Sequence, residues 1–373
     1  MLRDGTYVAT PGAPSASALG PADIDDALDR LREAVLSGDD GAPAVAAVDH
    51  LVGNAARLEV RDLDLRYVDR VGRSEEGVRA AVSVTWRFAG FDREPARTEV
   101  EMTVSAGDGS AGEAVVTDIG GGDGRTPLWL TGPVEVRRTP EVLVVAAPGA
   151  DLAGVTRRAE AAVPVVRRVL DRWRPRLVVE VPSSADGLGD LLGAEDGTYD
   201  GVAAVTASPD GSLAPEAPLH VFVNPEVLGT LRPQGAQVVL SHEAAHVATR
   251  APLSGSPLWL LEGFADYVAL RDVDLPLSTT AAQVIAQVRD EGLPEALPGP
   301  AEFDTGTTHL GASYEAAWLA CTVLAERVGA PGLVDLYRAV ERDGLDRALR
   351  RVAGWSEADL TRAWQRRLAA LAA

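Results

Sequence analysis

The sequence predicts an α+β protein of two domains: a small domain of helices and an antiparallel sheet, then a larger domain with a small sheet and a helical half. The chain has 373 residues, which is long for one domain. Apolar residues alternate with polar ones between about residues 58 and 104, whereas they recur at helical spacing from about residue 234 onward. The predicted parts are a flexible tail at 1–20, an α+β domain at 21–131 and a second domain at 132–373.

The first domain is expected to open with a helix. Residues 1–20 are rich in Pro, Ala, Ser and Gly and read as a tail. Pro21 suits the first turn of a helix. Apolar residues follow it at helical spacing: Ile24, Leu28, Leu31 and Val35. A second short helix is predicted at about 42–56.

The pattern then changes to the period of a β-strand. Apolar and polar residues alternate over 82–88 and 100–104, and a similar series at 58–65 contains one slip that suggests a bulge. Such alternation is typical of an antiparallel sheet with one buried face. Helices followed by this sheet resemble, in architecture only, the cone-shaped fold of nuclear transport factor 2 and its relatives.

A glycine-rich run marks the predicted boundary between the domains. Gly120, Gly121, Gly122 and Gly124 surround Asp123. Such a run can cradle a phosphate when a helix follows, but here Pro127 and a strand-like Leu-Trp-Leu segment follow. A turn is therefore the favoured interpretation.

The second domain is predicted to contain a few short apolar strands and many helices. The strands lie at 142–146, 177–181 and 220–223, and a helix lies at 152–172. From about residue 234 to the end the pattern is helical throughout. This order indicates a small sheet followed by a helical half.

Composition excludes some partners and leaves others open. Acidic residues number 55 against 35 basic ones, so the net charge of −20 argues against nucleic acid and anionic membranes. No apolar run approaches the roughly 18–20 residues that span a bilayer, and no signal-peptide pattern is expected. The single cysteine, Cys321, excludes an intrachain disulfide and lies in an apolar run. Oligomeric state and compartment stay open, including a location outside the cytoplasm if a leader has been removed.

The most informative segment is His242-Glu243-Ala244-Ala245-His246. In a helix the two histidines lie one turn apart on one face, so both imidazoles can reach one ion. Zinc prefers such nitrogen ligands, and the adjacent Glu243 can take a proton from a water molecule at the metal. The alternative is an ordinary helix with two partly exposed histidines.

A second segment supports the metal. A catalytic zinc needs a third protein ligand, and Glu262 follows His246 by sixteen positions within an apolar run. A carboxylate in such surroundings needs a partner, which a zinc ion supplies. Asp266 lies one turn later and is expected to orient a ligand imidazole. For Asp266 the alternative is a solvated or helix-capping carboxylate.

These two segments together resemble the gluzincin metallopeptidases. The helix motif is followed by Trp259-Leu260-x-Glu262-Gly263-Phe264-Ala265, which is similar to the aminopeptidase and leukotriene A4 hydrolase branch, although the intervening segment is shorter here. The resemblance implies a thermolysin-like catalytic domain at 132–373 and one zinc ion per chain on His242, His246 and Glu262, with Glu243 as general base. It covers about 235–330 strongly and does not extend to the first domain.

A third segment extends the resemblance. The branch has a Tyr-Glu-Lys-Gly-Ala run whose tyrosine stabilises the oxyanion, and this chain has Tyr314-Glu315-Ala316-Ala317. The resemblance therefore implies that Tyr314 donates a hydrogen bond to the oxyanion. The alternative is a core tyrosine that shares a helix face with Trp318 and Cys321.

One departure concerns substrate specificity. The aminopeptidase motif that binds a substrate's free amine is absent from the strand before the zinc helix, and only Glu226 is near. We predict that this strand, headed by His220, is a sheet edge that pairs with an extended peptide. Internal cleavage is then favoured over removal of N-terminal residues.

The leading hypothesis is a zinc-dependent peptidase that acts on peptides or proteins. Two alternatives are a binding protein with a vestigial metal site and a zinc hydrolase of a non-peptide substrate. His220 could line the cleft and His309 could donate to the oxyanion, although a structural role is favoured for both. His50 is expected to be structural.

Overall fold

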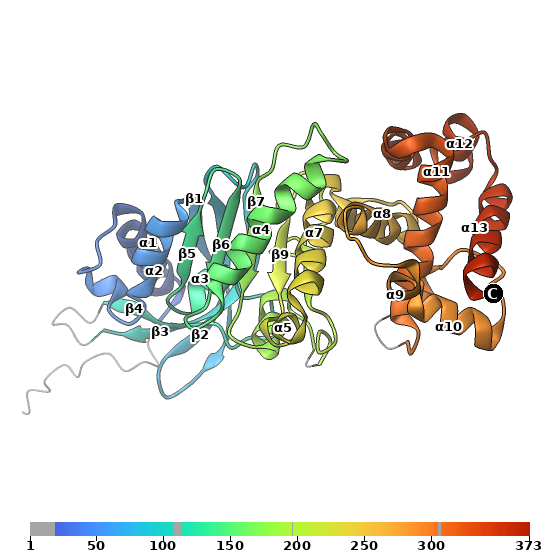
Figure 1. Cartoon of the computed structure of the whole chain (residues 1–373). Helices are drawn as coiled ribbons and strands as arrows, with labels where there is room; N and C mark the ends of the chain where they lie inside the picture. The colour runs from blue at the N-terminus through green and yellow to red at the C-terminus, as the bar shows by residue number, and fades with distance from the viewer. Residues whose placement is uncertain (1–18, 108–112, 196, 305–306) are drawn as a thin grey trace, which may run out of the picture. The chain divides into compact units, whose positions relative to one another are not determined.

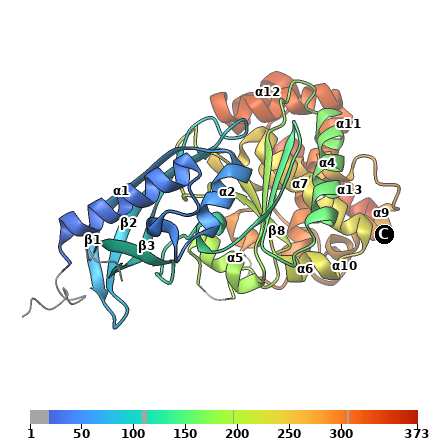
Figure 2. The same cartoon turned by 90° about the vertical axis from the view of Figure 1, so that its left-hand side faces the viewer.

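The computed structural model describes residues 19–107, 113–195, 197–304 and 307–373. They form two compact units, drawn from blue to red along the chain in Figures 1 and 2. Unit 1 is Met1–Val134 with Asp190–Gly193, and unit 2 is Glu135–Gly189 with Ala194–Ala373. The predicted tail lies outside the described residues, except for Leu19 and Gly20.

Unit 1 combines helices with an antiparallel sheet. Its helices are α1 (Pro21–Ser37), the 3-10 turn η2 (Pro43–Val45), α2 (His50–Leu58) and α3 (Leu128–Thr131). Its strands are β1 (Val60–Arg73), β2 (Val78–Phe88), β3 (Ala96–Ala106) and β4 (Ala114–Ile119), which pair in sequence order. An antiparallel sheet near the N-terminus was predicted, and this part of the fold prediction is confirmed.

Local sequence explains these elements. The apolar residues of α1 are buried, and α1 contacts both edge strands of the sheet, β1 and β4. The slip predicted near residue 62 is a bulge in β1 between Arg61 and Asp64. The strand-like segment 128–130 is instead the helical turn α3. Its three apolar side chains are all buried, and Asn54 donates to the carbonyls of Trp129 and Gly132 at 2.8 Å each.

The sheet of unit 2 has five strands in the order β5-β6-β7-β9-β8. The strands are β5 (Glu135–Arg138), β6 (Val142–Ala146), β7 (Leu177–Val181), β8 (Ala204–Ala207) and β9 (His220–Val223). β6, β7 and β9 run parallel, and the two outer strands pair antiparallel to them. The three apolar strands that the sequence predicts are therefore the central ones, which is why they are apolar on both faces.

One prediction about this sheet is wrong. β9 was expected to be an edge strand, but it lies between β7 and β8, and β8 forms the edge. All four residues of β9 are buried, as in a central strand, whereas β8 alternates between buried and half-buried. β8 escaped prediction because four residues carry almost no periodic signal.

The rest of unit 2 is largely helical, as predicted. The helices are α4 (Leu152–Arg167), α5 (Ala185–Leu192), α6 (Pro225–Thr230), α7 (Pro233–Thr249), α8 (Leu258–Leu270), α9 (Leu277–Thr280), α10 (Ala282–Glu291), α11 (Leu310–Asp343), α12 (Leu345–Val352) and α13 (Glu357–Ala372), with 3-10 turns η3 (Ala251–Leu253) and η4 (Pro300–Phe303). α4 and α7 pack together along the sheet, and α8 packs against both α7 and α11 (Figure 1).

A glycine sets the approach of α8 to α11. A Cβ atom on Gly263 would lie 2.2 Å from the Ala317 carbonyl oxygen, so no larger residue fits there. This close contact lets α8 pack tightly against α11 at Ala317 and Cys321. The glycine that follows Glu262 is therefore required for the packing of α8 against α11.

α11 is long and kinked. Its backbone leaves helical geometry at Gly329 (φ 75°), two residues before Pro331. Among the described residues α11 alone has the length and apolarity of a membrane span, with 50% of its most apolar window buried inside the fold. A core helix of a folded domain has this same composition. Cys321, in the middle of α11, is buried, and burial raises the pKa of its thiol.

Candidate metal centre

α7 carries the first two residues of the site. Pro233 opens this helix, and its buried residues Leu240, Ala244 and Ala245 hold it in the core of unit 2. His242 and His246 lie one turn apart, as the spacing predicts. Their rings meet edge to face, with centroids 4.5 Å apart and an interplanar angle of 83°.

α8 supplies a carboxylate to the same point. The Nε2 atoms of His242 and His246 are 2.9 Å apart, and Glu262 Oε2 lies 3.2 Å from each. Burial would raise the pKa of the Glu262 carboxyl, but the charge of His246 and hydrogen bonds from both imidazoles hold that pKa well below its ordinary value. The carboxylate is therefore ionised and faces two nitrogen atoms.

These three atoms could hold a metal ion. Each of the three atoms can direct a lone pair toward one central point. A single metal cation at that point can bind all three atoms, whereas a shared proton can join only two of them. A tetrahedral zinc ion with bonds of about 2.0–2.1 Å has ligand atoms roughly 3.3 Å apart. The observed separations of 2.9–3.2 Å are close to that value. The residues present therefore fit a small divalent cation.

Asp266 fixes the orientation of one histidine. Its Oδ1 lies 2.8 Å from His242 Nδ1, so that nitrogen donates and Nε2 is turned toward Glu262. Burial would lower the pKa of His242, but the charge and hydrogen bond of Asp266, with the Glu262 contact, raise it well above its ordinary value. The Nδ1 atom of His246 differs, because it is buried without a hydrogen-bond partner among the described residues.

Glu243 lies beside the three converging atoms and has its own partner. Thr206 of β8 donates its hydroxyl to Glu243 Oε2 at 2.6 Å. The hydroxyl also lies 3.2 Å from the backbone carbonyl oxygen of Glu243. Burial raises the pKa of the Glu243 carboxyl, although both histidines and Thr206 oppose this shift. The sequence offered no signal for Thr206, because β8 itself was not predicted.

A cavity of about 350 Å³ opens beside these residues. Its polar walls include His242, Glu243, Asp266, Gln283, Tyr314 and Glu315, and its apolar walls are Ala203, Ala204, Val238 and Val239. β8 therefore forms part of the cavity as well as holding Glu243. An open, partly apolar cavity with a few convergent polar groups is typical of a small binding site.

Tyr314 faces this cavity from the first turns of α11. Its ring centroid lies 6.2 Å from that of His242 and packs edge to face against Phe303 at 5.4 Å. Burial raises the pKa of the phenol, as do the charges of Glu262, Glu243 and Asp266. The hydroxyl therefore keeps its proton and can donate it in a hydrogen bond. It has no hydrogen-bond partner within the described part of the chain.

Glu315 connects two walls of the cavity. Its carboxylate accepts a hydrogen bond from the Val284 amide at 2.8 Å, at the start of α10. A carboxylate at a helix N-terminus satisfies an amide that has no partner inside the helix. Burial raises the pKa of this carboxyl. No signal in the sequence pointed to this role of Glu315, although the residue follows Tyr314 directly.

The remaining candidate residues lie elsewhere. His220 is fully buried in β9 with Nδ1 2.7 Å from Glu180 Oε1, so the hypothesis that it lines the cleft is wrong. His309 is exposed and lies 3.5 Å from Glu291, away from the cavity wall. Glu226 accepts a hydrogen bond from the Ala185 amide at 3.2 Å. His50 contacts the Leu130 carbonyl at 3.0 Å within unit 1.

Sequence comparisons add no family. No protein-family model matches this chain, and no curated protein matches it closely enough to indicate a relative. The chemistry of the site therefore rests on its own geometry: two imidazoles and a carboxylate converge on one point, and a buried carboxylate and a phenol lie beside it.

Proposed function

We propose that unit 2 is a zinc-dependent metallopeptidase of the gluzincin type. His242, His246 and Glu262 would hold one zinc ion, and Glu243 would act as general base. The observation that carries the proposal is the convergence of the three ligand atoms within 2.9–3.2 Å beside a buried carboxylate and a cavity. A purely structural zinc site has four protein ligands and no need of a base.

Each residue has a role in hydrolysis. A zinc ion held by these residues would supply Lewis-acid chemistry and would make a water molecule more acidic. Glu243 accepts the proton of the attacking water and later delivers it to the leaving amine. Burial raises the pKa of the Glu243 carboxyl above its ordinary value, which is the direction that makes a carboxylate a better proton acceptor. Tyr314 donates a hydrogen bond to the carbonyl oxygen as negative charge develops there.

Two further residues position these groups. Asp266 orients His242 through Nδ1, and Thr206 holds the carboxylate of Glu243 by the same hydroxyl that contacts the helix backbone. Such neighbours fix the rotamers of catalytic side chains. Both are positioning residues, since neither would touch the substrate carbonyl.

The proposed substrate is a peptide or protein cut internally. β8 ends the sheet, so its outer edge offers backbone groups for an extended peptide, and Ala203 and Ala204 lead from it into the cavity. The carboxylates on the cavity wall each have a donor already: Asp266 has His242, Glu243 has Thr206 and Glu315 has Val284. Among the described residues, no carboxylate on this wall stands unpaired to receive a free amine, which favours endopeptidase activity over aminopeptidase activity.

The central experiment uses Glu243→Gln, which keeps the size of the side chain and removes its basicity. We expect hydrolysis of a mixed peptide library to fall by at least ~10²-fold, as for loss of a general base. Metal analysis should still find about one zinc per chain. The exposed Glu160→Gln on α4 is the matched control and should keep full activity.

Three outcomes separate the alternatives. Activity that disappears with chelator and in Glu243→Gln supports the peptidase. Zinc without hydrolysis of any peptide supports a non-catalytic protein or a hydrolase of another substrate class. Retained activity in Glu243→Gln contradicts the proposed mechanism. Matched peptides with free and acetylated N-termini test the cleavage mode, and stepwise release of single amino acids from free N-termini alone would contradict internal cleavage.

A further inference from the structure

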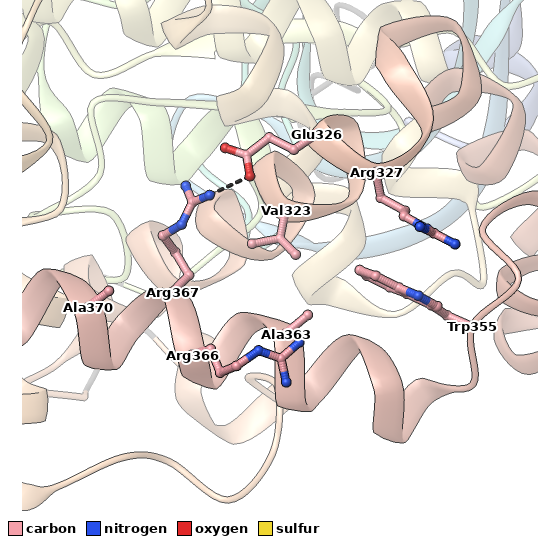
Figure 3. A pocket seen from close by; sticks show the side chains of 8 residues that line it. All are labelled: Val323, Glu326, Arg327, Trp355, Ala363, Arg366, Arg367 and Ala370. Carbon is pink, nitrogen blue, oxygen red and sulfur yellow. Dashed lines mark hydrogen bonds and ion pairs between the residues drawn. The ribbon is translucent and has the colours of Figure 1, made fainter.

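A second cavity of about 410 Å³ lies in the helical half of unit 2. It is formed by α11, α13 and the turn between α12 and α13 (Figure 3). Its walls are Val323, Glu326, Arg327, Trp355, Ala363, Arg366, Arg367 and Ala370, and none of these lines the metal cavity. The proposed peptidase chemistry therefore leaves this cavity unexplained.

The charge of the cavity is opposite to that of the chain. The chain has 55 acidic and 35 basic residues, yet three arginines and one glutamate line the cavity. Arg367 pairs with Glu326, as the dashed line in Figure 3 marks, so these two charges compensate each other. Arg327 and Arg366 remain, with a net local charge of about two positive units.

Arg327 is held in a defined orientation. Its guanidinium carbon lies 5.4 Å from the centre of the Trp355 ring, within the range of a cation–π contact. Its Nε atom donates to the Ala353 carbonyl at 3.3 Å. The two Nη atoms have no partner among the described residues. A fixed guanidinium loses less conformational entropy when it binds a carboxylate or phosphate in a bidentate manner.

Arg366 provides the second cation. It is exposed, and no carboxylate or carbonyl in the described ranges pairs with it. It projects from α13 between Ala363 and Ala370, and Val323 of α11 adds a further apolar wall (Figure 3). The cavity thus combines two cationic groups with an apolar surface, and Trp355 is half-buried at its rim.

We propose that this cavity binds a small organic anion that carries a carboxylate or phosphate group. The Arg327 guanidinium contacts the anionic group, Arg366 adds a second positive charge on the α13 wall, and the apolar part of the ligand lies on Val323, Ala363 and Ala370. The volume of about 410 Å³ is within the range of small-molecule sites, and the hollow is open to solvent on one side. Arg367 completes the wall and is kept in place by Glu326.

The experiment measures binding of three probes to the full chain by calorimetry at constant ionic strength: inorganic phosphate, succinate and phenyl phosphate. Phenyl phosphate should bind at least several-fold more tightly than inorganic phosphate, since it adds apolar contact. The phosphate and succinate arms identify which anionic group the two arginines prefer. Sodium chloride at matched concentration corrects for nonspecific screening.

Variants locate the site. Arg327→Ala should weaken binding by at least about 10-fold, because it removes a charge-assisted hydrogen-bond donor. Arg366→Ala should weaken binding by a smaller but measurable factor, because it removes a nearby positive charge. Trp355→Ala should weaken binding less, and Trp355→Phe should restore part of the loss. The control is Arg362→Ala, one turn before Arg366 on α13 and paired with Asp359, which should bind as the parent does.

Two results would overturn the proposal. One is the absence of binding by all three probes at millimolar concentration. The other is binding that is weakened equally by Arg362→Ala and Arg366→Ala, which would indicate general attraction to the surface. Circular dichroism of each variant confirms that it is folded. Peptidase activity is measured separately, so a loss of catalysis and a loss of anion binding are distinguishable.

Discussion

Unit 2 contains two histidine–carboxylate pairs of almost identical geometry in different surroundings. His220 Nδ1 lies 2.7 Å from Glu180 Oε1, and His242 Nδ1 lies 2.8 Å from Asp266 Oδ1. Each histidine also has an aromatic ring nearby. The ring centroids of His220 and Phe222 are 6.1 Å apart, and those of His242 and Tyr314 are 6.2 Å apart. The contact on Nδ1 is therefore the same in both places.

The difference lies at the rest of the ring. His220 is 0% exposed within the central strands of the sheet. His242 borders a cavity, and its Nε2 meets a second imidazole and a carboxylate oxygen. A carboxylate on Nδ1 thus stabilises a buried histidine in one place and orients a candidate ligand in the other. The opposite ring nitrogen decides between these roles.

The largest expected effect separates the two histidines. His242→Ala should abolish zinc binding with a modest change in stability, because it removes one ligand at a cavity wall. His220→Ala should instead lower the free energy of unfolding by about 3–5 kcal/mol, since it leaves Glu180 buried without its partner. Metal analysis and denaturant titration measure the two effects. If His220→Ala also loses zinc while folded, the comparison fails.

The second effect concerns the neighbouring rings. Tyr314→Phe gives His242 the kind of neighbour that His220 has, and it removes only the hydroxyl. We expect kcat to fall by ~10²-fold with little change in zinc content, as for loss of an oxyanion donor. Tyr337→Phe on the same helix, where the ring packs on Phe264, is the control. Unchanged kcat with a lower Tm in Tyr314→Phe would favour a packing role.

A third test exchanges the carboxylates for amides. Asp266→Asn should weaken zinc affinity by about 10- to 100-fold, because the histidine loses its charged orienting partner. Glu180→Gln should leave zinc affinity unchanged and affect stability alone. Competition with a chelator gives both affinities. Equal losses in the two variants would mean that the two pairs do not differ in the way inferred here.

The smallest effect belongs to the hydroxyl that holds the base. Thr206→Val keeps the shape of the side chain and its preference for a strand. We expect kcat to fall by about 10-fold, the lower end of the value of one hydrogen bond to a charged group, with KM and zinc content unchanged. Thr206→Ser retains a hydroxyl and should recover much of the rate. A fall in zinc content would instead indicate that β8 supports the whole site.

Part of the fold and of the candidate metal site follows from the sequence, because local geometry is set by neighbouring residues. The spacing of His242 and His246 places them on one face of any helix, and the apolar runs at 142–146, 177–181 and 220–223 are the strands they predict. The period of a helix or strand is written into neighbouring residues. All four apolar side chains that predict α1 are buried for the same reason: Ile24, Leu28, Leu31 and Val35.

The sequence by itself thus determined most element types, the α+β class and the candidate ligands, because these depend on residues close together in the chain. Tertiary structure alone decided which strand forms the edge, which hydroxyl meets Glu243 and which arginines surround a cavity. β8 pairs with β9 through hydrogen bonds between backbone atoms. Backbone pairing does not depend on side-chain type, so the sequence of a four-residue strand does not reveal it. Thr206 and Glu243 are distant in sequence, so only the packing of α7 against the end of the sheet brings them to 2.6 Å.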